Sequence, residues 1–264
     1  MTTLYWIIAA TFAGGLLSAL IASLVLLLGD DLRHRLIPHF ISFATGALLG
    51  AAFLALLPHA IAKAGAENIH LLGAAVLAGL LAFFFLEKLV IWRHCHHDDC
   101  EAHDPHGHDQ IQVGRDKASG TLILLGDAIH NAIDGVLIAA AFLTDVHLGV
   151  MTAIAVVAHE IPQEVGDFAI LLRAGYTRMR AFVVNLLVGL TTVVGGLLAW
   201  AFLEQTRVAL PYVLAVAASS FIYVAVADLI PGMHQRTQAR ESFAQAVLII
   251  VGVLVIAFSH EWAH

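Results

Sequence analysis

The sequence predicts an all-α, polytopic membrane protein of eight transmembrane helices, with the N- and C-termini outside. Three observations indicate this fold. The 264 residues are 60% hydrophobic and only 12% charged, with a mean hydropathy of +0.86, whereas soluble domains average about 45–50% apolar and about 25% charged residues. Apolar runs long enough to cross a bilayer fill most of the chain. Lys and Arg gather in alternate connections between these runs.

The first apolar run begins at Tyr5 and is interpreted as a retained span, because its flank lacks the positive charge of a cleavable signal and the run is too long for one. Most later connections are short, and the long hydrophilic stretch 93–118 is the exception. We therefore expect a single transmembrane domain over 1–264, with 93–118 as a cytosolic loop between spans three and four. The eight expected spans are 5–28, 37–57, 70–92, 119–143, 147–172, 179–203, 209–231 and 243–260.

Basic residues set the orientation, because Lys and Arg near span ends resist translocation. With the N-terminus outside, the outer side holds only Lys63 and Arg207 of the 13 basic residues. Both termini are therefore expected to face outward, and we expect a multi-pass position in the plasma (inner) membrane. The other 11 lie on the inner side: Arg33, Arg35, Lys88, Arg93, Arg115, Lys117, Arg173, Arg178, Arg180, Arg236 and Arg240.

A weaker signal is an internal repeat. Residues 44–58 can be laid on residues 217–231 so that two alanines, a leucine and the final proline coincide. Span two would run outward and span seven inward, so the pair would be an inverted repeat, which is a common plan among transporters. The matching pairs are Ala44 with Ala217, Ala52 with Ala225, Leu56 with Leu229 and Pro58 with Pro231.

Polar residues form one stripe on span four and one on span five, at helical spacing and near the bilayer midplane. Each charge at this depth costs about 2.5–3.5 kcal/mol even on a mild insertion scale, so the five carboxylates would cost of order 10 kcal/mol in lipid. Neither span has Lys or Arg in its middle, which leaves an external cation as the partner. The stripes are Asp127, His130, Asn131 and Asp134, and then Glu160, Gln163, Glu164 and Asp167, with His159 at the edge.

Imidazole with carboxylate suits Zn²⁺ and other first-row divalent ions. His130 and Asp134 stand one turn apart and can bind one ion from one helix, while Asn131 and Glu160 either complete that site or form a second one beside it. Two of the stripe carboxylates, Asp127 and Asp167, lie nearer the cytosol and are assigned to an exit path or second coordination shell, with plain structural polar contacts as the alternative. Asp228, at the inner end of span seven, is given the same assignment, and a solvated helix end accounts for it equally well.

The stretch 94–109 packs six His, five Asp or Glu and two Cys into sixteen residues. Such a composition cannot build a core, and His-rich tracts commonly bind metals. In the cytosol the cysteines stay thiols and add soft ligands, which suits a buffer, an acceptor or a feedback sensor; the alternative is a solvated linker. The expected ligands in the loop are His94, Cys95, His96, His97, Cys100, His103, His106 and His108.

The segments "HNAIDG" (130–135) and "HEIPQEVGD" (159–167) resemble the two signature segments of the ZIP (Zrt/Irt-like) divalent metal transporters. The eight spans, outward termini and His-rich loop also fit that family. The resemblance implies uptake of Zn²⁺, and in some members Fe²⁺, Mn²⁺ or Cd²⁺, by a homodimer in which one helix group slides against the other. It places the transport ligands on His130, Asn131, Asp134, Glu160 and Gln163, with His159 and Glu164 adjoining.

Two departures from the family pattern matter. Gln163 stands where many members carry Glu or His, and span two has Ala51 and Ala55 where relatives often have acidic or His residues. We expect no enzymatic activity, resident cofactor or nucleic-acid partner. Two alternatives remain: efflux of metal, and an intramembrane zinc protease, for which Gln163 replaces the second His of H-E-x-x-H and Pro162 interrupts the helix.

Overall fold

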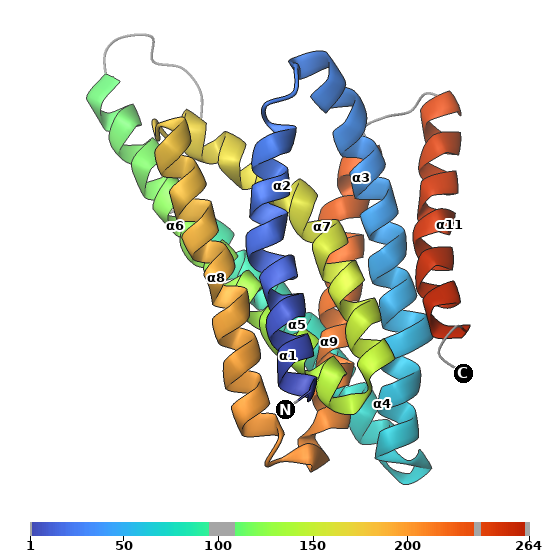
Figure 1. Ribbon diagram of the computed structural model, residues 1–264. Helices are drawn as coiled ribbons and strands as arrows, with labels where there is room; N and C mark the ends of the chain where they lie inside the picture. The colour runs from blue at the N-terminus through green and yellow to red at the C-terminus, as the bar shows by residue number, and fades with distance from the viewer. Residues whose placement is uncertain (1, 95–108, 235–238, 262–264) are drawn as a thin grey trace.

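The computed structural model describes residues 2–94, 109–234 and 239–261 (Figure 1). Within these ranges every regular element is a helix, which confirms the predicted all-α fold. The elements are α1 (Thr2–Phe12), η1 (Ala13–Leu17), α2 (Ser18–Val25), α3 (Asp30–Gly50), η2 (Ala51–Leu56), α4 (Leu57–Ala64), η3 (Ala66–Asn68), α5 (Ile69–His94), α6 (Asp109–Thr144), α7 (Val146–Arg173), α8 (Arg178–Leu203), η4 (Arg207–Ala209), α9 (Leu210–Tyr223), η5 (Val224–Leu229), α10 (Ile230–His234) and α11 (Ala239–Glu261).

Seven stretches of the described chain are long and apolar enough to cross a membrane. The eighth expected span is α7, which is less apolar than these seven because it contains the polar stripe. Its 28 residues nevertheless extend about 42 Å, which is more than the ~30 Å thickness of the hydrocarbon core. The chain is therefore an integral, multi-pass membrane protein. α6 already begins at Asp109, so residues 109–118, expected in the loop, are helical; no proline interrupts them.

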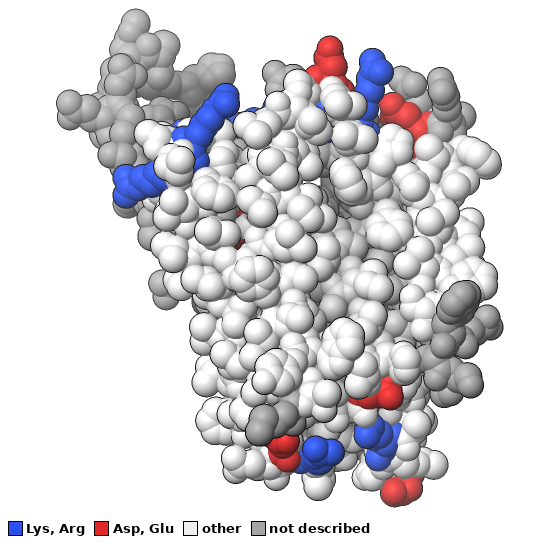
Figure 2. Space-filling model, viewed as in Figure 1, with Lys and Arg blue, Asp and Glu red and all other residues white. Residues whose placement is uncertain are grey.

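The helices cross the bundle from end to end (Figure 1). α5 ends and α6 begins at one end, whereas α1 begins and α11 finishes toward the opposite end. On the face shown in Figure 2, a broad uncharged band separates the Lys, Arg, Asp and Glu residues near the two ends. This band has the chemistry of a surface that faces lipid.

α6 and α8 pack with their backbones in close contact. A Cβ atom on Gly135 would lie 1.9 Å from the carbonyl oxygen of Thr192, and one on Gly195 would lie 2.0 Å from that of Ala132. Small residues permit such an approach, and membrane helices use it because dispersion contacts replace the hydrophobic driving force. The pairing holds α8 against the helix that carries half of the polar stripe.

Local signals fix both ends of α7. The Asp145 carboxylate accepts hydrogen bonds from the backbone N–H groups of His147 (2.8 Å) and Leu148 (3.1 Å) and so caps the first turn. At the other end Gly175, with φ of 86°, follows the last turn. These two signals set the depth at which the middle of α7 lies in the bundle.

π-helical turns support the internal repeat seen in the sequence. η2 (Ala51–Leu56) and η5 (Val224–Leu229) occupy equivalent positions when residues 44–58 are laid on 217–231. Each turn ends two residues before a proline, Pro58 or Pro231. Proline lacks an N–H group and its ring displaces the carbonyl four residues earlier, which favours a widened turn at this point. The two segments run in opposite directions in Figure 1, as an inverted repeat requires.

Candidate metal centre

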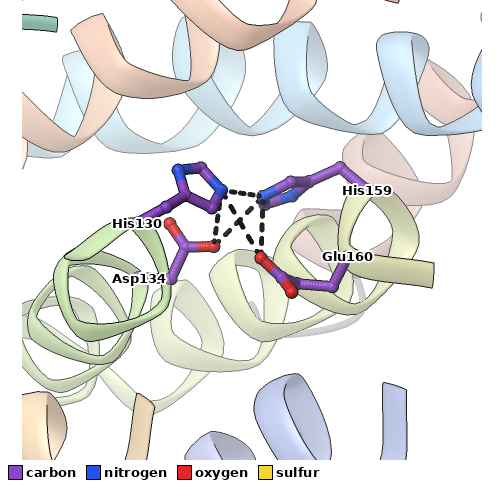
Figure 3. A group of neighbouring side chains, drawn as sticks. All are labelled: His130, Asp134, His159 and Glu160. Atoms are coloured by element: carbon purple, nitrogen blue, oxygen red, sulfur yellow. Dashed lines mark hydrogen bonds and ion pairs between the residues drawn. The ribbon is translucent and has the colours of Figure 1, made fainter. Parts of the chain in front are cut away.

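Two antiparallel helices in the middle of the bundle bring part of the expected polar stripe together. Figure 3 shows His130 and Asp134 of α6 directed toward His159 and Glu160 of α7. His130 is 17% exposed, whereas the other three side chains are 0–1% exposed. The short turn at Asp145 makes α6 and α7 neighbours, so residues distant in sequence reach the same depth.

The four side chains each offer one ligand atom, and these atoms all lie within 4.8 Å of one another. His159 Nε2 lies 3.1 Å from Asp134 Oδ2 and 3.3 Å from His130 Nε2. Glu160 Oε1 lies 3.4 Å from His130 Nε2 and 3.7 Å from His159 Nε2, and the pair on α6 is 3.8 Å apart.

These separations match the geometry of a bound ion. Ligands at about 2.0–2.1 Å from a tetrahedral Zn²⁺ are separated from one another by about 3.3 Å. The measured separations of 3.1–3.8 Å lie around that value. Five of the six separations among the two imidazole nitrogens and the two carboxylate oxygens are therefore those expected of ligands to one divalent ion.

The hydrogen bond of His159 fixes the form of its ring. Its Nδ1 lies 2.9 Å from the carbonyl oxygen of Ala155, to which it donates. In the neutral ring the other nitrogen, Nε2, then presents a lone pair to Asp134 and His130. Metal-binding histidines commonly use one nitrogen in this way and keep the other for the ion.

The carboxylates of the cluster lack hydrogen-bond donors. Both oxygens of Asp134 and both of Glu160 are buried without a hydrogen-bond partner. In the part of the chain that the structure describes, their ion-pair partners are the rings of His130 and His159. Two buried carboxylates with neutral imidazoles leave two negative charges, which one divalent cation would neutralise.

Asn131 is directed away from the four-residue cluster. Its Nδ2 donates to Asp127 Oδ1 over 2.9 Å, and its Oδ1 accepts a 2.7 Å hydrogen bond from Thr192 Oγ1 of α8. Both ends of the amide are therefore engaged. Its role as a direct ligand, which the family resemblance implied, stays a prediction and requires the amide to turn.

The remaining stripe residues lie around the cluster rather than within it. Gln163 and Asp167 line a cavity of about 290 Å³ that also reaches His130. Glu164 is fully buried, and neither of its oxygens has a hydrogen-bond partner. Asp228, expected at the inner end of span seven, belongs to η5 and lines the same cavity.

The cavity lies between the metal cluster and one end of the bundle. Its lining comes from the last part of α5, the middle of α6, the second half of α7, and the end of α9 with η5. The α5 and α7 residues place it on the side of the cluster that faces the end where α5 stops and α6 starts. Among the described residues the polar lining contains no Lys or Arg and is mostly acidic, which favours a cation. These polar residues are Glu87, Asp127, His130, Gln163, Asp167, Tyr223 and Asp228.

Apolar packing covers the opposite side of the cluster. The Phe221 ring lies 6.1 Å from the His159 ring and is fully buried. Leu137 and Ile138 follow Asp134 on α6 and are 0–1% exposed, and Val156 precedes His159 on α7 and is also buried. An ion in the cluster would therefore have a polar route on one side and close-packed side chains on the other.

Sequence reasoning overlooked four residues near the site. Thr192 and Asn185 of α8 are buried polar groups on the α6 and α7 side, but α8 reads as an ordinary apolar span. Tyr223, the last residue of α9, donates a hydrogen bond to Glu87 of α5. This bond connects the two helices at the wall of the cavity. In the sequence Glu87 is followed by Lys88, and the two together look like the charged end of span three.

Of the metal ligands expected in the His-rich loop, only His94 lies within the described residues. His94 is the last residue of α5, and the other expected loop ligands lie outside the described residues. They are Cys95, His96, His97, Cys100, His103, His106 and His108. Their metal binding stays a prediction.

Comparison with known proteins connects this geometry to a family. Residues 92–260 match the family model described as ZIP Zinc transporter. "Zinc transporter ZIP13" of Pongo abelii is 35% identical over 235 residues, which cover 82% of this chain and 64% of that protein. The Mus musculus protein of that name is 35% identical over 251 residues, 82% of this chain and 68% of that protein.

A third relative, "Zinc transporter foi" of Drosophila melanogaster, is 40% identical over 133 residues, 50% of this chain and 18% of that protein. The chain thus spans a little under two thirds of the length of the Pongo relative. The family match extends over both signature helices and most of the spans. The chain belongs to the ZIP zinc transporter family.

Proposed function

We propose that this chain carries divalent transition-metal cations, Zn²⁺ foremost, across the membrane into the cytosol. Family membership supports divalent metal transport in general. The observation that carries the specific proposal is the cluster of His130, Asp134, His159 and Glu160, whose ligand atoms converge and whose buried carboxylates lack donors. These residues form the transport site, and the ion is its substrate.

The ligand set favours borderline divalent ions. Two imidazole nitrogens with two carboxylate oxygens suit Zn²⁺, and also Fe²⁺, Mn²⁺ or Cd²⁺. Both cysteines of the chain lie in the loop at Cys95 and Cys100 and not in the spans. A site without thiolates binds zinc less tightly than a Cys₄ cage, which lets a carrier release its cargo.

The asymmetry around the site supports alternating access. The cavity beside His130 leads toward the end of the bundle that carries Lys88 and Arg173. Basic residues mark the cytosolic side, so this conformation is open inward. Asp127, Asp167 and Asp228 then line the route by which the ion leaves.

Two groups of helices would move relative to each other. α8 packs closely on α6, and also on η1, where a Cβ on Gly15 would lie 2.0 Å from the Gly189 carbonyl oxygen. In the other group, a Cβ on Gly46 of α3 would lie 2.1 Å from the Ile249 carbonyl oxygen of α11. Between the groups, η2 lies against α7. The buried residues of η2 include Ala55, which has a small side chain. The contact between η2 and α7 can therefore slide more easily than the close glycine contacts within each group can come apart.

Further features of the proposal follow from the family resemblance and the charge pattern. The protein acts as a homodimer in the plasma (inner) membrane, and the stretch 94–109 binds arriving metal on the cytosolic side. The intramembrane protease alternative is disfavoured, because Gln163, at the position of the second His of that motif, lies on the cavity wall outside the four-residue cluster. Efflux of metal remains the alternative, and a measurement of the direction of transport decides between the two.

Proteoliposomes test the proposal directly. The full chain is reconstituted, its orientation is measured by protease access to the loop, and uptake of radioactive Zn²⁺ is followed with Fe²⁺, Mn²⁺, Cd²⁺ and Mg²⁺ as competitors. We expect Zn²⁺ to move toward the side that bears the loop and to be inhibited by the transition metals but not by Mg²⁺. Absence of metal flux from correctly inserted protein would contradict the proposal.

Efflux is separated from uptake in cells. A strain that lacks the protein should be starved of metal and grow poorly when a chelator is present. If it instead becomes sensitive to added metal, the direction is outward. Asp134→Asn expressed in that strain should behave as the deletion does, which ties the phenotype to the site.

A further inference from the structure

The connection between α7 and α8 gathers positive charge at one end of the bundle. Arg173 is the last residue of α7, and Arg178 and Arg180 lie in the first turn of α8. All three side chains are exposed. Only residues 174–177 separate the two helices, so the Cα atoms of Arg173 and Arg178 are at most about 18 Å apart. The three arginines therefore form one basic surface, which we call the arginine turn.

The arginine turn has no acidic residue to balance its charge. The sequence contains no Asp or Glu between Asp167 and Glu204. Among the residues whose side chains the structure describes, none forms an ion pair with the three arginines. The guanidinium groups are thus available to an anion from outside the described chain.

The charges of Arg178 and Arg180 also oppose the dipole of the helix that carries them. The N-terminal end of a helix is the positive end of its dipole, so acidic residues are favoured in the first turn and cations are disfavoured. α8 has no acidic residue there. By contrast α3, which begins at the same end of the bundle (Figure 1), opens with two aspartates before its two arginines. The first turn of α8 therefore has an unbalanced positive charge that the first turn of α3 does not have.

Hydrogen bonds hold the arginine turn in a fixed shape. The N–H groups of Gly175 and Tyr176 donate to carbonyl oxygens in the last turn of α7, over 3.1 and 3.0 Å, and Gly175 has a φ of 86°, which is the Schellman ending of a helix. The Thr177 hydroxyl accepts a hydrogen bond from the backbone N–H of Arg180 (3.3 Å). The guanidinium of Arg180 lies 4.8 Å from the centroid of the Tyr176 ring, a cation–π contact. A surface that is ordered before binding loses less entropy when it binds a ligand.

The neighbours of the arginines place them at the membrane surface. Met179, between the two arginines of α8, is 70% exposed. Tyr176 packs on the buried side chains of Phe168 and Leu171, and tyrosine is enriched where the apolar part of a membrane meets water. On the face shown in Figure 2, Lys and Arg lie at the edges of the uncharged band. The arginine turn therefore lies where phospholipid headgroups surround the protein.

We propose that the arginine turn binds the phosphate group of an anionic phospholipid at the membrane surface. Arginine binds phosphate through two parallel N–H groups, and basic residues at the ends of membrane spans are attracted to anionic lipids. Met179 contacts the acyl chains beside the bound headgroup. Because the turn joins α7, which carries half of the four-residue cluster, to α8, the lipid holds both helices at one depth. The proposal does not depend on metal transport.

Lipid binding by the purified full chain tests this proposal. Protein in a neutral detergent is titrated with phosphatidylglycerol or with phosphatidylcholine of the same acyl chains, and native mass spectrometry counts the bound lipids. We expect wild-type protein to bind its first phosphatidylglycerol at least about tenfold more tightly than phosphatidylcholine. Combined Arg178→Gln and Arg180→Gln should remove this preference and leave phosphatidylcholine binding unchanged. The matched control is combined Arg33→Gln and Arg35→Gln on α3, which removes the same charge and should change phosphatidylglycerol affinity less than about twofold.

Two further measurements identify what occupies the arginine turn. Soluble glycerol phosphate should not displace phosphatidylglycerol, and displacement at equal concentration would overturn the lipid assignment in favour of a site for free phosphate. Replacement of residues 95–108 by a Gly–Ser segment should leave phosphatidylglycerol affinity unchanged, whereas an increase would overturn the proposal by showing that acidic residues of that stretch occupy the turn. The proposal is also overturned if the α8 variant binds phosphatidylglycerol as tightly as wild type, or if the α3 control loses as much affinity.

Discussion

His159 Nε2 lies 3.1 Å from Asp134 Oδ2, and this contact joins α7 to α6 at the centre of the bundle. His159 Nδ1 is occupied by the Ala155 carbonyl, so the neutral ring presents a lone pair to the carboxylate. Two acceptors at this distance repel each other unless a proton or a metal ion lies between them. The 3.1 Å approach of these two atoms is therefore stable only when a proton or a metal ion lies between them.

Asp134→Asn should abolish transport while the protein remains folded. The substitution keeps the shape of the side chain but removes a charged ligand, so we expect zinc uptake by proteoliposomes to fall at least about 100-fold. Asp145→Asn, which changes a carboxylate at the turn outside the site, is the matched control and should transport normally. Wild-type uptake by correctly inserted Asp134→Asn would remove this residue from the site.

Thr192→Val should weaken transport without touching a ligand of the four-residue cluster. The change removes the 2.7 Å hydrogen bond to Asn131 Oδ1 and leaves that buried oxygen without a donor, at a cost of about 1–3 kcal/mol in unfolding free energy. Metal affinity should fall about tenfold as Asp127 loses its fixed orientation. Thermal unfolding and zinc titration measure the two effects. An unchanged affinity would show that the hydrogen bonds from Thr192 to Asn131 and from Asn131 to Asp127 have only a structural role.

Gly135→Ala should disrupt the α6–α8 contact. Its Cβ would lie 1.9 Å from the Thr192 backbone oxygen, so the helices must separate; we expect a loss of at least about 2–3 kcal/mol. Gly166→Ala on α7 is the control, since a Cβ there meets nothing within 4 Å, and alanine in a helix should be neutral or stabilise by up to about 1 kcal/mol. Equal melting temperatures for the two variants would contradict the packing.

The cap at Asp145 gives α7 a pH-dependent contribution. Partial burial acts to raise the pKa of Asp145, but hydrogen bonds from the N–H groups of Leu148 and His147, helped by the His147 and His59 rings, hold it below the usual value. A lowered folded-state pKa means that the stabilisation is fully present above about pH 4 and is lost as the pH falls through the lowered value.

The matched pair for this prediction is Asp145→Ala and Asp145→Asn. Alanine removes the cap, and we expect a cost of about 1 kcal/mol at neutral pH, whereas asparagine caps almost as well and does not titrate. The difference between wild type and Asp145→Ala should shrink on acidification below pH 4. Melting curves between pH 3 and pH 7 measure it, and a constant difference would contradict the role of the charge.

Replacement of residues 95–108 by a Gly–Ser segment of the same length should preserve transport. The four-residue cluster is built from α6 and α7, so we expect maximal uptake to stay within about twofold while apparent affinity or regulation shifts modestly. Uptake as a function of free Zn²⁺ separates the two quantities. Complete loss of transport by well-folded protein would mean that the loop takes part in the transport step.

The sequence by itself determined the architecture and the chemistry of the site. Apolar runs of bilayer length predicted the spans closely: the expected 179–203, for example, is α8 at Arg178–Leu203. Helical spacing predicted that His130 and Asp134 share a face, and the short turn at Asp145 predicted that α6 and α7 are neighbours. These features are local, because hydropathy and the 3.6-residue period act within a single helix.

Only the tertiary structure decided which polar residues meet. Asn131 is directed toward Thr192 of α8, and His159, which the sequence places at the edge of its stripe, belongs to the cluster. Periodicity gives the direction of a side chain around its own axis but not the rotation and depth of the helix packed against it. That rotation is set by contacts between residues far apart in the chain, such as Gly135 against Thr192. The rotation in turn decides which polar residues can hold an ion and which only orient the residues that do.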